Sequence, residues 1–117
     1  MDRYGITKGE GRTKVSLSVT YMGSVPVVSI YNENPHLGAV AVGEYDDKSG
    51  RTSVSVLTRL GHKDDAIAQK SAYLISKSIK GPSCVIAGIH LDDITEEEIG
   101  KFMDNADLLV NDFLNKK

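Results

Sequence analysis

Residues 14–21 alternate between apolar side chains and lysine, serine or threonine. A period of two places every second side chain on the same face of an extended chain, so this segment predicts a β-strand with one buried face. Four further segments favour strands, through alternation or a short apolar run: 25–31, 37–45, 51–58 and 83–89. The last of these is short and apolar, which is typical of a central strand.

Two segments change to a helical period. Over residues 64–80 the apolar positions form neighbouring helical stripes, and Gly81-Pro82 follows as a helix-ending pair. A second helix begins with the capping-box sequence Thr95–Glu98, and its apolar positions continue to Phe113. The element order is therefore ββββαβα. This order predicts an α+β fold with a mainly antiparallel sheet and two helices packed on it.

Composition limits the class of protein. The chain has 117 residues, of which 40% are hydrophobic and 26% charged, as in a globular protein. We expect a flexible N-terminal arm over residues 1–12, which is rich in glycine and shows no period, and a single domain over 13–117. The net charge of −2 gives no reason to expect nucleic acid or an anionic membrane as a partner. No signal peptide or membrane span is evident, and the single Cys84 excludes an intrachain disulfide, so we expect a cytoplasmic protein.

Three histidines lie in polar junctions where apolar runs start or stop: His36, His62 and His90. The strand after His36 runs away from it, and the hairpin at 46–50 returns the next strand towards His62. The helix over 64–80 has 17 residues and spans about 25 Å, and a seven-residue strand returns about 23 Å. We therefore expect all three histidines at one edge of the sheet.

The same edge carries features that favour an anion. Both predicted helices begin there, and helix N-termini present unpaired amides and a partial positive charge. Arg59, His62 and Lys63 add cationic donors before the first helix. Neutral imidazole is also a common metal ligand. With an oxygen from Asp92 or Asp93, ligands from three loops would suit zinc, iron or manganese.

Simpler roles exist for the acidic residues. Asp64, Asp65, Asp92 and Asp93 are typical helix-capping or first-turn residues without any ligand. The histidines are separated by 26 residues (36 to 62) and 28 residues (62 to 90), which matches no compact metal motif. The chain also lacks a dinucleotide-binding glycine motif, a Walker loop and a nucleophile elbow. This pattern favours binding over catalysis.

The histidine junctions resemble the LpdD-like prenylated-flavin chaperone family over about residues 14–115. The segments that carry the resemblance are Pro35–Ala41, Gly61–Asp65, Ala87–Asp92 and Thr95–Ile99. The resemblance implies a small cytosolic homodimer that accompanies UbiD-like decarboxylases and is related in fold to the proteasome assembly chaperones. It also implies binding of prenylated flavin mononucleotide (or FMN), with a divalent metal near its phosphate.

Carried over to this chain, the resemblance assigns roles to individual residues. His36, His62 and His90 would be metal ligands or phosphate contacts, with Arg59 and Lys63 as further cofactor contacts. Asp92 would orient a histidine or join the metal ligands. Aromatic residues are sparse for a flavin site, because only Tyr31 and Tyr45 lie on the flanking strands.

Two other functions stay open at this point. The first is a protein-interaction module like the proteasome assembly chaperones, which the implied fold relationship supports. The second is a small metal-dependent hydrolase, in which a histidine–aspartate site would generate a hydroxide nucleophile. No dedicated general acid or base is evident in the sequence, so the second alternative has the weaker support.

Overall fold

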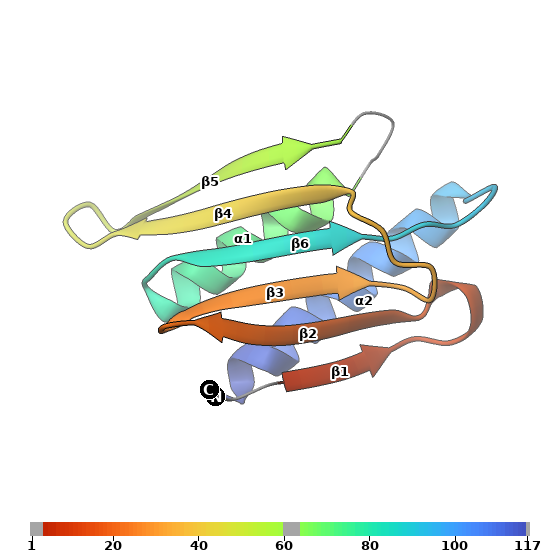
Figure 1. Cartoon of the computed structure of the whole chain (residues 1–117), viewed down its shortest axis with the longest axis horizontal. Coiled ribbons are helices and arrows are strands. Elements are labelled where there is room, and N and C mark those ends of the chain that lie inside the picture. The colour runs from red at the N-terminus through yellow and green to blue at the C-terminus, as the bar shows by residue number, and fades with distance from the viewer. Residues whose placement is uncertain (1–3, 60–63, 117) are drawn as a thin grey trace.

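The computed structural model describes residues 4–59 and 64–116. One six-stranded sheet forms a layer, and two helices cover one of its faces (Figure 1). The strands are β1 (Tyr4–Lys8), β2 (Val15–Met22), β3 (Val25–Tyr31), β4 (Ala39–Asp46), β5 (Arg51–Thr58) and β6 (Ser83–Gly88). The helices are α1 (Asp65–Ile79), α2 (Glu96–Asn115) and the short 3₁₀ helix η1 (Gly11–Thr13). The predicted α+β fold class is confirmed.

The strand order in the sheet is β1-β2-β3-β6-β4-β5. In the described part of the chain, β3 and β6 pair in parallel, whereas the other neighbouring strands pair antiparallel. Strand β6 is therefore central, as its short apolar sequence predicts. The predicted order ββββαβα holds from β2 to α2.

Strand β1 is a correction to the expected N-terminal arm. Residues 1–12 show no period in the sequence, yet Tyr4–Lys8 pair antiparallel with β2. Tyr4 packs against Phe113 of α2 with ring centroids 5.6 Å apart, and Ile6 packs against the core. The strand offers only two apolar side chains, Tyr4 and Ile6, so its local pattern is weak. Tertiary contacts with β2 and α2 stabilise it instead.

The helix-facing side of the sheet forms the core. Helix α1 packs on β4, β5 and β6, and α2 packs on β1 and β2. The strands and helices contribute the following buried apolar residues: Val15, Leu17, Val19, Val28, Ile30, Ala39, Ala41, Val85, Ala87, Ile67, Ala68, Ala72, Ile75, Phe102, Ala106, Leu109, Val110 and Phe113. The alternation in β2 turns Ser16, Ser18 and Thr20 to the opposite face, where β3 places Val27, Ser29 and Tyr31. Neither α1 nor α2 covers that face (Figure 1).

Local sequence signals set the helix ends. Thr95 and Glu98 form the predicted capping box, in which each side chain accepts a hydrogen bond from the backbone N–H of the other residue. Helix α1 ends at Ile79, and its C-cap residue Lys80 has a left-handed backbone conformation with φ of 55° and is followed by Gly81-Pro82. These local signals determine where α2 begins and where α1 ends.

The loop over residues 32–38 must cross the end of β6, because it joins β3 to β4 on either side of that strand. It passes over Gly88, where a Cβ atom would overlap the carbonyl oxygen of His36. The amide of Gly38 donates to the carbonyl of Ala87 at 3.0 Å. The absence of a side chain at Gly88 therefore allows the crossing loop to lie directly on the sheet.

Candidate functional site

His36 and His90 meet at one edge of the sheet, as chain direction predicts. Their ring centroids are 5.5 Å apart and the rings are inclined by 70°. His36 lies on the crossing loop, and His90 follows β6 by two residues. These two residues are 54 positions apart in the sequence, so only the tertiary fold brings them together.

Asp64 orients His36. Its buried carboxylate lies 3.2 Å from Nε2 of His36 and accepts a hydrogen bond from the amide of Ile89 at 3.3 Å. Asp64 occupies the N-cap position of α1, but its side chain makes no capping hydrogen bond. The capping role that its position suggests is therefore not its role here. Gly38 leaves the space for this carboxylate, because a Cβ at Gly38 would overlap it.

Asn32 holds His90 in place. The Asn32 side-chain amide donates to the carbonyl of His90 at 2.7 Å, and its oxygen accepts from the His90 amide at 3.2 Å. Asn32 is 7% exposed, so both bonds are shielded from water. This side chain continues the pairing of β3 with β6 beyond the last residues of both strands. The sequence gives no sign of this role, since Asn32 lies in an ordinary turn sequence.

Asp92 contacts the second histidine. Its Oδ1 atom lies 3.2 Å from Nε2 of His90, and both side chains are more than half exposed. This contact agrees with the orienting role proposed for Asp92. Each described histidine of this edge thus has one carboxylate beside Nε2, an arrangement that sets the direction of the ring.

Arg12 anchors the loop that carries Asp92. Its guanidinium donates to the Asp92 carbonyl at 2.9 Å and to the Glu98 carboxylate at 2.8 Å. The hydrogen bond from Arg12 lowers the pKa of Glu98 from 4.5 to about 2, with a further contribution from the Thr95 amide. The sequence gives no sign of this role for Arg12, because the residue lies within the expected flexible arm. The expected arm therefore supports the site.

The remaining predicted cations divide into two groups. Arg59 lies at the same edge. Its guanidinium donates a hydrogen bond to the carbonyl of Leu37 at 3.1 Å, and its backbone amide donates one to the carbonyl of Gly38 at 2.9 Å. His62 and Lys63 lie outside the described residues. Across residues 4–59 and 64–116, no group of three histidine, cysteine or acidic side chains is arranged to hold a metal ion.

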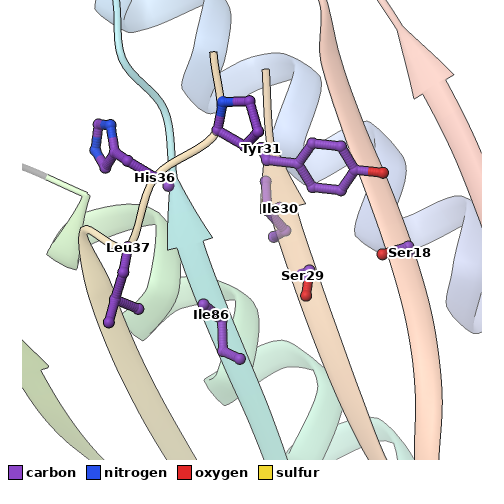
Figure 2. Close-up of a pocket in the computed structure, with 9 residues that line it drawn as sticks. Ser18, Ser29, Ile30, Tyr31, His36, Leu37 and Ile86 are labelled. Carbon is purple, nitrogen blue, oxygen red and sulfur yellow. The ribbon is translucent and has the colours of Figure 1, made fainter. Parts of the chain in front are cut away.

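A cavity of about 470 Å³ lies beside His36 on the helix-free face of the sheet. Ser18, Ser29 and Ile86 project from neighbouring strands, and the crossing loop borders one end (Figure 2). The ring of Tyr31 extends from β3 towards the strand that carries Ser18 (Figure 2). We call this cavity the open-face trough; its lining residues are Ser18, Ser29, Ile30, Tyr31, Pro35, His36, Leu37, Ile86 and Gly88.

The sequence profile described as the prenylated flavin chaperone LpdD-like domain matches residues 9–117. The chain belongs to this family. The LpdD-like match includes both described histidines, their aspartate partners and all the residues that line the trough, and β1 is the one strand that precedes it among the described residues. Comparison with curated proteins gave no match.

The LpdD-like fold is similar to a solved structure from another chaperone system. That structure is a novel chaperone complex for yeast 20S proteasome assembly, and the chains superpose with a TM-score of 0.60. The sequences are 16% identical, and the alignment covers 98% of this chain and 94% of the other. At this identity the similarity shows a shared fold, as the resemblance predicts. Neither helix of the described residues is long and apolar enough to cross a membrane.

Proposed function

We propose that this chain binds prenylated flavin mononucleotide and delivers it to a UbiD-like decarboxylase. The family match over residues 9–117 carries the proposal. The geometry supports it, because His36, whose ring lies 5.5 Å from that of His90, lines a cavity of about 470 Å³, which is within the usual size range of ligand sites. In this proposal the protein holds and transfers the cofactor and performs no reaction of its own.

The histidine edge is the proposed phosphate site. His36, His90 and Arg59 lie together there, and their nitrogen atoms can donate hydrogen bonds to phosphate oxygens. His62 and Lys63 connect β5 to α1 in the sequence, so we assign them to the same phosphate. The buried Asp64 does not compete for this position, because its oxygens are directed to His36 and Ile89.

A divalent metal near the phosphate forms a separate part of the proposal, with His36, His62, His90 and Asp92 as ligands. The described residues supply two histidine–aspartate pairs, so a complete ligand set depends on His62. A bound metal would neutralise part of the phosphate charge. We further propose that the protein acts in the cytoplasm as a homodimer.

Co-expression with a flavin prenyltransferase tests the proposal directly. We expect the purified protein to carry a bound flavin, seen in its visible spectrum and by mass, and to restore activity to a cofactor-free UbiD-like decarboxylase. The variants His90→Ala and Arg59→Ala should retain less flavin. Arg51→Ala is the matched control for Arg59, because Arg51 is the first residue of β5 and Arg59 directly follows the last residue of that strand, at its other end.

The outcomes separate the candidate functions. A colourless, metal-free protein whose His62→Ala and His90→Ala variants behave like wild type contradicts the proposal. Bound metal with phosphoester turnover would favour the hydrolase instead. The metal content of wild type and His62→Ala, measured by elemental analysis, tests the metal ligands independently of the flavin. Light scattering of the purified protein tests the homodimer.

A further inference from the structure

One row of side chains on the helix-free face of the sheet changes from hydroxyl-bearing to aliphatic as it crosses the sheet. Directly paired residues on neighbouring strands project from the same face. One row across the sheet runs from β1 to β5 through these paired residues: Gly5, Ser18, Ser29, Ile86, Val40 and Leu57. Its first half carries two hydroxyls, and its second half carries three aliphatic side chains.

The neighbouring rows do not show this change. The next row away from the histidine edge is Thr20, Val27, Cys84, Val42 and Ser55, with a valine on β3 and a hydroxyl on β5. The row nearer that edge contains Thr7, Ser16, Tyr31 and Gly88. Val42 and Leu57 are 45% and 77% exposed, so water reaches large apolar side chains on this face.

The open-face trough lies where the row through Ser18 and Ile86 changes from hydroxyl-bearing to aliphatic side chains. Ser18 and Ser29 lie on its polar side, and Ile86 and Leu37 lie on its apolar side (Figure 2). Ser18 and Ile86 are two strands apart, about 9.6 Å. That distance is comparable to the length of three fused six-membered rings. His36 borders both the trough and the proposed phosphate site.

We propose that the trough receives the ring system of the flavin and selects the prenylated form. The polar edge of the ring, with its carbonyl and N–H groups, lies against the hydroxyls of Ser18 and Ser29. The hydrocarbon that prenylation adds lies against Ile86 and Leu37, and its contact removes apolar surface from water. Tyr31 provides aromatic contact at the end of the trough. This inference rests on the proposed function, which it extends by assigning the ring-binding face and the source of selectivity.

Binding titrations with FMN and prenylated FMN test the inference. Ile86→Ala should weaken binding of prenylated FMN about tenfold and binding of FMN less than about twofold. The reason is that only prenylated FMN has the added hydrocarbon that contacts Ile86. Ser29→Ala should weaken both about fivefold, because both share the polar edge. Val42→Ala and Ser55→Ala are matched controls on the same face outside the trough, and neither should change either affinity.

The outcomes distinguish this inference from the proposed function. If wild type binds neither flavin, both are wrong. If wild type binds flavin but Ile86→Ala weakens the two forms equally, or has no effect, the trough assignment is wrong and the proposed function stands. Amide shifts on FMN binding should cluster at Ser18, Ser29 and Ile86. If Ile86→Ala instead converts a dimer to a monomer without altering affinity, a second copy occupies this face and the inference fails.

Discussion

Asp64 provides the sharpest test of how the site is held together. Asp64 is 6% exposed, and its carboxylate links α1 to the crossing loop through His36 and to the end of β6 through the Ile89 amide. The variant Asp64→Ala removes this link while leaving the helix-forming residues of α1 in place. Asp65 is the natural control, because it is an exposed aspartate in the first turn of the same helix.

The expected cost follows from the groups that lose a partner. Without the carboxylate, the half-buried Ile89 N–H loses its acceptor, which costs about 2 kcal/mol. For a chain of 117 residues this corresponds to a fall in Tm of about 8 °C, at about 4 °C per kcal/mol. Asp65→Ala removes only a charge near the helix N-terminus and should cost about 0.5 kcal/mol. Asp64→Asn keeps an oxygen for Ile89 and should recover more than half of the loss.

Urea denaturation, monitored by circular dichroism, measures the free energy of unfolding of each of the three variants relative to wild type. Hydrogen exchange of the Ile89 amide reports the contact itself, and it should become faster in Asp64→Ala but not in Asp65→Ala. Equal stability losses in Asp64→Ala and Asp65→Ala, with an unchanged Ile89 exchange rate, would refute the linking role of Asp64.

Three further predictions concern other parts of the chain. Gly88→Ala should lower Tm and weaken flavin binding, because the added Cβ would overlap the His36 carbonyl. Gly100→Ala is the control, since its Cβ would meet no atom within 4 Å, and it should stabilise α2 by about 1 kcal/mol. Equal effects of the two variants on Tm in thermal melts would contradict this prediction. Ionised Glu98 stabilises the fold fully above its ordinary pKa of 4.5, and this contribution is lost as pH falls towards about 2. The difference in unfolding free energy between wild type and Glu98→Gln should therefore shrink from about pH 6 to about pH 2.5, and a constant difference would count against the Arg12 contact. Burial raises the pKa of Cys84, so iodoacetamide should modify it slowly until urea unfolds the chain; immediate reaction in the folded protein would be the contrary result.

Local patterns predict most of the elements correctly. Alternation in β2 and the capping box of α2 depend on residues within one element, so they are visible in the sequence. Strand β1 is not visible in this way, because its two apolar side chains gain their contacts from β2 and α2. The prediction for Asp64 failed for a related reason. An aspartate before a helix has the same sequence context whether it caps the helix or contacts a distant histidine.

The sequence by itself determined that His36 and His90 lie at the same end of the sheet. Chain direction and element lengths are sufficient for that conclusion, because strands and helices have fixed rises per residue. Only the tertiary structure decided the lateral distance, since strand order is set by long-range pairing. The central position of β6 and the passage of the crossing loop over Gly88 bring the two rings to 5.5 Å. The same pairing places Ser29 beside Ile86 and so gives the trough a polar and an apolar side.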